Sequence, residues 1–166
     1  MVTRAFPDIN FSVSHVDALT VVAVSSSLNL GIDVETIDQH LNGSVVAGFC
    51  HAKEHSVLEG LPHHQKVREF VRFWTQKEAY TKLIGLGHSV EFNSINCLTG
   101  PNTIEPSSAI SLMHFESFFV PIDRSLYHAS LSMEPPKSNI TSVDVQLMNV
   151  VGPDRTKDAS PAPVSI

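Results

Sequence analysis

The chain has 166 residues, of which 42% are hydrophobic and 17% are charged, a balance that predicts a single globular domain rather than a disordered chain. Eleven Lys and Arg against seventeen Asp and Glu leave a net charge of −6, which argues against a general nucleic-acid-binding protein. Two cysteines do not make a disulfide framework, and no apolar run reaches the roughly 20 residues that a membrane span needs. We therefore expect a cytoplasmic protein that binds neither nucleic acid nor membranes.

The first part of the chain predicts three strands. Residues 11–13 and 19–24 have the composition of strands, with a polar corner over residues 14–17 between them. Residues 30–34 form a third predicted strand. Residues 36–61 begin with a polar stretch and then have the pattern of a helix.

The clearest helix covers residues 66–83. Val67, Phe70, Val71 and Trp74 follow one another at i, i+3, i+4 and i+7, so they form an apolar stripe on one face. Two nearby glycines, Gly85 and Gly87, are expected to end it.

Strand-like composition returns after this helix. It occurs in residues 90–98, 109–120 and 127–133, and the tail from residue 152 has the proline content of a disordered terminus. Strands on both sides of a helical middle predict an α+β domain.

Most of the positive charge lies in one segment. Six of the eleven basic residues fall within thirty positions: Lys53, Lys66, Arg68, Arg72, Lys77 and Lys82. In an acidic protein such a segment could meet an anionic ligand or an acidic partner. An ordinary solvated helix face is the alternative.

Two pairs of charged residues suggest chemistry. Asp33 and Glu35 stand two apart at the end of a predicted strand, so both carboxylates point to one face, where they repel unless a cation or hydrogen bonds hold them. Glu78 and Lys82 share a helix face at i and i+4. Each pair alone is also common in proteins without a metal site.

Other site classes fit less well. His51 and His55 have the i, i+4 spacing of a zinc-binding helix, but the glutamate of the HExxH motif and a cysteine pair are missing, so we expect solvent-facing histidines. The sequence has no Gly-rich phosphate loop and no GxSxG nucleophile motif.

Taken in order, five segments resemble a known family. They are Phe11-Ser12-Val13-Ser14-His15, Gly31-Ile32-Asp33-Val34-Glu35, Phe49 with Glu54, the run FWTQKEAYTK at residues 73–82, and Gly85-Leu86-Gly87. This set resembles the 4′-phosphopantetheinyl transferases of the surfactin-synthetase-activating type, with their SH corner, G(I/V)D(I/V)E strand, FxxxxE element and WxxKEAxxK helix. The resemblance covers residues 6–133 and implies that family's α+β fold, a small antiparallel sheet packed against helices.

The resemblance also implies a reaction. The family transfers 4′-phosphopantetheine from coenzyme A to a serine of an acyl or peptidyl carrier protein and releases adenosine 3′,5′-bisphosphate. Mg²⁺, which Mn²⁺ can replace, is expected on Asp33, Glu35 and Glu78. Glu78 is the expected general base, and Lys82 the expected contact to the α-phosphate and proton donor to the leaving group. The expected coenzyme contacts are Arg4, Ser14, His15, Lys77 and Lys82.

The same resemblance makes the basic segment the expected docking surface for an acidic carrier protein. The surfactin type has two similar lobes, whereas this chain starts just before the SH corner. We therefore expect residues 1–30 to be a remnant of the first lobe, residues 31–150 the core lobe and residues 151–166 a disordered tail.

We expect self-association, in which a second copy replaces the first lobe; a truncated chain and a reduced relative are the alternatives. The alternative functions are a catalytically reduced protein that binds coenzyme A or a carrier protein, and an accessory subunit of a complete synthase.

Overall fold

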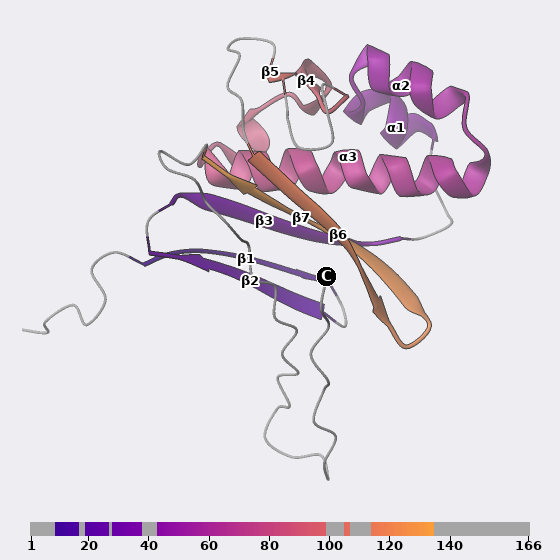
Figure 1. Ribbon diagram of the computed structural model, residues 1–166. Coiled ribbons are helices and arrows are strands. Elements are labelled where there is room, and N and C mark those ends of the chain that lie inside the picture. The colour runs from indigo at the N-terminus through magenta and orange to yellow at the C-terminus, as the bar shows by residue number, and fades with distance from the viewer. Residues whose placement is uncertain are drawn as a thin grey trace, which may run out of the picture. The chain divides into compact units, whose positions relative to one another are not determined.

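A three-stranded antiparallel sheet forms the centre of the structure, with helices on one face and a β-hairpin packed against it (Figure 1). This computed structural model describes residues 9–16, 19–26, 28–37, 43–98, 105–106 and 114–134, all within the compact unit Met1–Pro135. The α+β fold predicted from the sequence is therefore confirmed.

The sheet has the strand order β3-β7-β6, formed by β3 (Leu30–Thr36), β7 (Ser125–Met133) and β6 (His114–Ile122). Asp33 lies opposite Ser130, and Glu35 lies opposite His128. Because residues directly opposite in an antiparallel pair share a face, these four side chains project to the same side of the sheet. That side carries the longest helix.

Three helices lie on this side of the sheet (Figure 1). They are α1 (Gly43–Phe49), α2 (Ala52–Glu59) and α3 (His63–Leu83), and α3 packs directly on β3 and β7. The helix predicted over residues 66–83 is confirmed, and the structure begins it three residues earlier. Gly85 and Gly87 follow its end with φ values of +71° and +49°, a conformation that favours glycine.

Gly31 allows α3 to lie unusually close to β3. A Cβ atom at this position would stand 2.6 Å from the backbone nitrogen of Leu83 and closer still to the carbonyl oxygen of Ala79. No other residue can therefore occupy this position without displacing the strand from the helix. The glycine of the GIDVE segment thus sets the distance between the two elements that carry the acidic and basic residues.

The hairpin consists of β1 (Asn10–Val16) and β2 (Leu19–Ser25). The predicted polar corner at residues 14–17 was wrong, because β1 continues through Ser14 and His15 to Val16. The reason is tertiary: β3 is an edge strand, and the hydroxyls of Ser12 and Ser14 accept the N–H groups of Ile32 and Val34 at 3.1 and 3.3 Å. Two polar side chains of β1 thus satisfy the open edge of β3 in place of a neighbouring strand.

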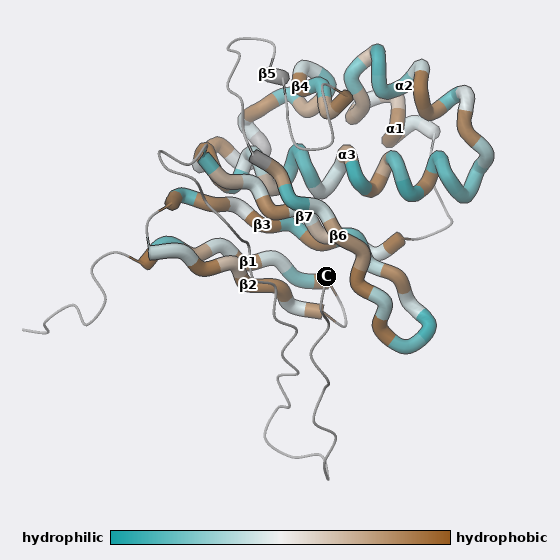
Figure 2. The backbone as a smooth tube through the Cα atoms, in the orientation of Figure 1, coloured by the Kyte–Doolittle hydropathy of each residue, from teal (hydrophilic) through white to brown (hydrophobic). Residues whose placement is uncertain are grey.

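Hydrophobic side chains fill both sides of the sheet. The first cluster joins α1, α2 and α3 and includes Phe49, Phe73 and Phe115. Two smaller clusters, around Ile32 and Val34, lie between the sheet and the hairpin. Figure 2 shows hydrophobic and hydrophilic residues alternating along the strands, as expected where successive side chains face opposite sides.

Not every predicted strand is present. Residues 90–98, expected to be a strand, instead contain the short helix η2 (Phe92–Ser94) and the two-residue strand β4 (Ile95–Asn96), which pairs with β5 (Glu105–Pro106). The apolar residues Val90, Phe92 and Ile95 pack in the cluster that the helices form, so they are buried without belonging to a long strand.

Two further features concern the ends and the surface. The predicted tail of residues 151–166, and residues 135–150 of the predicted core lobe, lie outside the described residues. No helix in the described part of the chain is both long and apolar enough to span a membrane.

Candidate active site

Asp33 is the centre of a polar cluster between β1, β3 and α3. It is buried, and its Oδ1 accepts hydrogen bonds from the Ser14 hydroxyl at 2.8 Å and from the Lys82 ammonium at 2.7 Å. Lys82 also donates to the carbonyl oxygen of Ile32 at 3.0 Å. The fold thus brings together three of the predicted site residues from three different elements.

The other oxygen of Asp33 is not satisfied. Asp33 Oδ2 is buried and has no hydrogen-bond partner among the described residues. Leaving a buried acceptor without a partner costs roughly 1–3 kcal/mol, and more for a charged group. A hard cation that prefers carboxylate oxygens is a suitable partner for such an atom.

Glu35 and Glu78 add negative charge next to Asp33. The pKa of Glu35 is raised to about 7, chiefly by burial and also by the charges of Asp33 and Glu78, while Lys82 and a hydrogen bond from Trp74 oppose this shift. Burial also raises the pKa of Asp33, although Lys82 and Ser14 oppose this shift. A bound cation would favour the ionised form of Glu35, which burial and the charges of Asp33 and Glu78 disfavour.

These residues fit Mg²⁺ or Mn²⁺ by their donor chemistry. Within the described ranges, however, no group of three or more His, Cys, Asp or Glu side chains is already close enough to hold one ion. The ion pair with Lys82 occupies one oxygen of Asp33. The unsatisfied Oδ2 is therefore the structural feature that most directly suits a cation.

Lys77, predicted to contact the coenzyme, lies elsewhere. Its side chain is completely buried, and its Nζ donates to Glu54 at 2.6 Å and to the carbonyl oxygen of Phe49 at 3.1 Å. Lys77 and Lys82 are five residues apart, about 140° around a helix, so they face opposite sides of α3. This placement corrects the prediction, because the ammonium of Lys77 is shielded from any ligand.

Glu54 is the partner that sequence reasoning left without a role. Its Oε1 accepts the Cys97 N–H at 2.7 Å, and its Oε2 accepts the His51 N–H at 2.9 Å in addition to Lys77. The glutamate of the FxxxxE segment therefore ties α2 to α3 and to the residue that follows β4. Lys77 lies one turn after Phe73, which is completely buried, so the two side chains share the buried face of α3.

The remaining predicted coenzyme contacts are placed differently from one another. Ser14 is buried against Asp33, whereas His15 is exposed and follows it on β1, so its side chain points to the opposite face of the strand. Arg4 lies outside the described residues. The structure thus brings Ser14, and not His15, to the acidic cluster.

Trp74 has a role beyond the core. Its ring stacks on Phe49 with centroids 4.2 Å apart, and it also hydrogen-bonds Glu35. The sequence pattern predicted only the packing role. Its spacing to Glu78 and Lys82, one and two turns later on the same helix face, was the available signal.

The histidines of α2 have local structural roles. His51 caps this helix, with its Nδ1 accepting the Lys53 N–H at 3.2 Å, and His55 lies 3.6 Å from Glu59. Neither belongs to a metal-binding cluster within the part of the chain that the structure describes.

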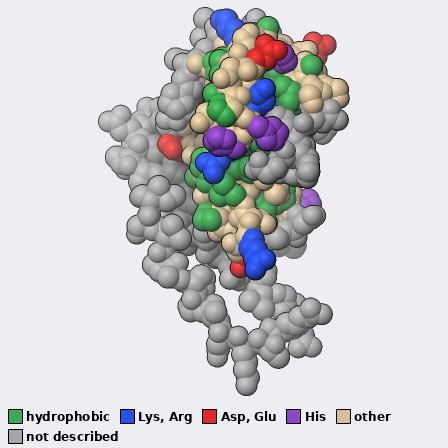
Figure 3. Space-filling model, turned by 90° about the vertical axis from the view of Figure 1, so that its right-hand side faces the viewer, with side chains coloured by type: hydrophobic (Ala, Val, Ile, Leu, Met, Phe, Trp, Pro, Cys, Tyr) green, Lys and Arg blue, Asp and Glu red, His purple; other side chains and the backbone are tan. Residues whose placement is uncertain are grey.

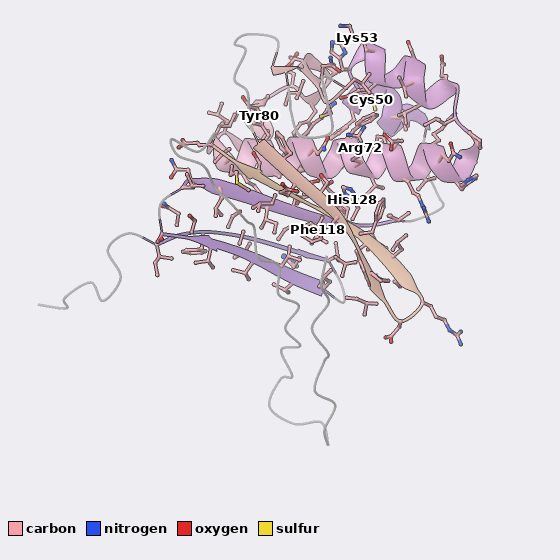
Figure 4. All side chains as sticks on the ribbon, viewed as in Figure 1. Cys50, Lys53, Arg72, Tyr80, Phe118 and His128 are labelled. Atoms are coloured by element: carbon pink, nitrogen blue, oxygen red, sulfur yellow. The ribbon has the colours of Figure 1, made fainter. Side chains whose placement is uncertain are left out.

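The basic segment does not form one continuous surface. Lys77 is buried, Lys82 pairs with Asp33, and Arg72 forms a 2.8 Å ion pair with Glu69. Lys53 and Arg68 are exposed, and Figure 4 shows Lys53 on the outer side of α2, directed away from the sheet. On the face in Figure 3, Lys and Arg side chains are separated by His and hydrophobic ones.

The family follows from sequence comparison. The 4′-phosphopantetheinyl transferase superfamily matches residues 29–122, more than half of the chain. The chain belongs to this superfamily. The matched region contains β3, α3 and β6, and therefore Asp33, Glu78 and Lys82.

Curated relatives carry the same superfamily name. The chain is 36% identical over 87 residues to 4′-phosphopantetheinyl transferase gsp of Aneurinibacillus migulanus, and 37% identical over 78 residues to 4′-phosphopantetheinyl transferase HetI of a Nostoc species. These matches cover 52% and 46% of this chain, but 36% and 33% of the relatives. The chain thus spans about a third of their length.

A solved structure supports the fold. The holo-(acyl-carrier-protein) synthase of Bacillus anthracis, crystallised in complex with CoA (3′,5′-ADP), matches with a TM-score of 0.50 and 19% sequence identity. The match covers 66% of this chain and 98% of the synthase. The superfamily's α+β arrangement is thus present in the described part of this chain.

Proposed function

We propose that this chain transfers the 4′-phosphopantetheine group of coenzyme A to a serine of an acyl or peptidyl carrier protein, with Mg²⁺ or Mn²⁺, as a member of the surfactin-synthetase-activating type. The observation that carries the proposal is the buried Asp33, with Lys82 on one oxygen and no partner among the described residues on the other, near Glu35, which also feels the charge of Glu78. Superfamily membership supports the same reaction. A cytoplasmic location stays a prediction.

The reaction needs one bond exchange. The serine oxygen attacks the phosphorus that carries pantetheine, the P–O–P bridge of coenzyme A breaks, and adenosine 3′,5′-bisphosphate leaves with the bridging oxygen. Glu78 accepts the serine proton, and Lys82 stabilises or protonates the leaving phosphate. Both residues lie on α3, with Lys82 anchored at β3.

Asp33, Glu35 and Glu78 are the residues that would hold the cation. When bound, a divalent ion neutralises charge on the pyrophosphate oxygens. The chain itself contributes the orientation of Asp33, set by Ser14 and Lys82, and the close approach of β3 to α3 at Gly31. His15 and Lys82 stay predicted coenzyme contacts.

The test is a transfer assay. The 166-residue chain is incubated with coenzyme A, Mg²⁺ and a panel of apo carrier proteins, and mass spectrometry records the carrier. A gain of one phosphopantetheinyl group on the acceptor serine is the expected result. Coenzyme A binding without transfer to any carrier would contradict the enzyme proposal and favour a catalytically reduced binder.

Two variants test the assigned roles. Glu78→Gln should lower the transfer rate by about 100-fold or more while the fold is retained, because the base is lost. Asp33→Asn should raise the Mg²⁺ concentration needed for half-maximal transfer, because it removes a carboxylate ligand of the cation. Glu59→Gln, an exposed glutamate on α2, is the matched control and should behave as wild type. Wild-type rates in Glu78→Gln would overturn the assignment of the base.

The proposed carrier partner is acidic, and the basic segment offers it the exposed Lys53 and Arg68 and the half-buried Lys66, although Arg68 also lies over the Phe119 ring, 5.7 Å from its centroid. Docking through them should weaken with salt, because exposed charges are screened within about 10 Å at 0.1 M ionic strength. Replacing Lys53 and Arg68 by Gln should therefore raise KM for the carrier more than KM for coenzyme A.

We also propose that the chain self-associates, so that a second copy covers apolar surface that a single copy exposes. It is supported by the outer face of the hairpin, which carries exposed apolar side chains. These are Ile9, Phe11, Val13, Val22 and Val24, each between 44% and 69% exposed.

A further inference from the structure

We infer that Ser14 is a positioning residue for the cation site, which acts through Asp33 rather than as a contact to the coenzyme. The inference deepens the proposed function and rests on it. It rests on the two hydrogen bonds of the Ser14 hydroxyl, which accepts one bond and donates the other.

The Ser14 hydroxyl has two partners on consecutive residues of β3. Its oxygen accepts the Val34 N–H at 3.3 Å, and its hydrogen is donated to Asp33 Oδ1 at 2.8 Å. Accepting from the backbone fixes where the oxygen lies, and donating to the carboxylate then fixes the Asp33 side chain. Ser14 is 7% exposed, so this hydroxyl is largely withdrawn from any ligand in solvent.

The consequence is a difference between the two oxygens of Asp33. Oδ1 carries both donors, Ser14 and Lys82, whereas Oδ2 has no partner among the described residues. A carboxylate fixed in this way keeps one defined oxygen ready for a cation. Outer hydrogen bonds to a metal-binding carboxylate commonly account for a 10- to 100-fold difference in metal affinity.

Lys82 alone would not fix the carboxylate as well. Its side chain is long and about a third exposed, so it can follow a rotating carboxylate. Ser14 is short and lies on a strand that is paired along its whole length with β2. It is therefore the more rigid of the two donors to Oδ1.

Ser12 provides a matched control within the same strand. Its hydroxyl accepts the Ile32 N–H at 3.1 Å, the same kind of bond that Ser14 makes to Val34. Of these two serines, Ser14 also donates a hydrogen bond to Asp33. Ser12→Ala and Ser14→Ala thus remove similar support from the edge of β3 but differ at the carboxylate.

The experiment measures Mn²⁺ binding to the full chain by calorimetry or electron paramagnetic resonance, without coenzyme A. Ser14→Ala should weaken Mn²⁺ binding about 10-fold or more, and Ser14→Thr, which keeps the hydroxyl, should restore most of it. Ser12→Ala should bind Mn²⁺ as wild type does. Denaturant unfolding should show that both alanine variants stay folded, with a somewhat larger loss of stability in Ser14→Ala because it also loses the bond to Asp33.

Two further readings separate this inference from its alternatives. Coenzyme A affinity is measured without a divalent cation, and Ser14→Ala should bind coenzyme A as wild type does. If Ser14→Ala loses as much affinity for coenzyme A as it loses for Mn²⁺, Ser14 is a coenzyme contact and the inference is overturned. Equal Mn²⁺ binding by wild type and Ser14→Ala would overturn it while leaving the proposed transferase standing. A wild-type chain that binds no Mn²⁺ would overturn both the cation site and the role of Ser14.

Discussion

At the scale of single residues, Lys77 and Glu54 form a completely buried ion pair inside the helical cluster. Each has further partners, the Phe49 carbonyl for Lys77 and two backbone N–H groups for Glu54. A buried pair of this kind adds little net stability over apolar side chains, but removing one partner leaves an uncompensated charge. Lys77 therefore matters to the helix that carries Glu78 without touching a ligand.

Lys77→Met should destabilise the protein by roughly 3–5 kcal/mol, because Glu54 then loses its counter-charge. Lys77→Met combined with Glu54→Gln should recover part of this loss. Denaturant unfolding measures both, with the exposed Lys53→Met as the control. A stability of Lys77→Met within about 1 kcal/mol of wild type would contradict the structural role.

His128 predicts how stability depends on pH. It is buried between β7 and α3, its Nδ1 lies 2.8 Å from the Thr75 hydroxyl, and burial together with Arg72 lowers its pKa to about 4 (Figure 4). The unfolded chain, with an ordinary histidine pKa near 6.5, takes up the proton first as pH falls. Above pH 6.5 the His128 ring is neutral in both the folded and the unfolded chain, so it does not reduce stability. Between pH 6.5 and 4 the free energy of unfolding falls by about 3 kcal/mol.

The measurement is the free energy of unfolding at several pH values. His128→Gln should remove most of the acid-dependent loss of stability, whereas His55→Gln, a more exposed histidine on α2, should leave it in place. If wild type and His128→Gln lose stability in parallel between pH 6.5 and 4, His128 is not the responsible group.

At the scale of elements, the packing of β3 against α3 depends on Gly31. Gly31→Ala would push its Cβ into the backbone of Ala79 and Leu83, so the strand and helix must separate. We expect a loss of stability of about 1–3 kcal/mol and a larger fall in transfer, because the Asp33–Lys82 pair spans the same contact. Gly48→Ala in α1, where a Cβ meets open space, is the control. Unchanged transfer by Gly31→Ala would show that this distance is not critical.

At the scale of the whole molecule, the exposed apolar face of the hairpin predicts association between copies. Phe11 and Val24 are directly opposite each other and are 69% and 62% exposed. Replacing them by Ser and Thr should lower the mass measured by light scattering or sedimentation, whereas Val57→Thr on α2 should not. A wild-type chain that is monomeric at every concentration would contradict this prediction.

Much of the site was predictable from the sequence, and the reasons are local. The apolar stripe beginning at Val67 predicted α3, and the helical period placed Glu78 and Lys82 on one face. The strand period placed Asp33 and Glu35 together. Lys77 could not be assigned in the same way, because the direction of a lysine on a helix becomes evident only when the neighbouring helices are in place.

The sequence by itself determined the superfamily, through the resemblance of its ordered motifs. It also determined the helix and the strand with its two carboxylates, because these depend on residue types and on periods of 3.6 and 2 residues. The tertiary structure decided which groups meet. Ser14, Asp33 and Lys82 lie 19 and 49 residues apart, and they touch only because β1 lines the open edge of β3 and Gly31 lets α3 approach it. The polar corner of the motif thereby became part of a strand in which Ser14 donates a hydrogen bond to the buried Asp33.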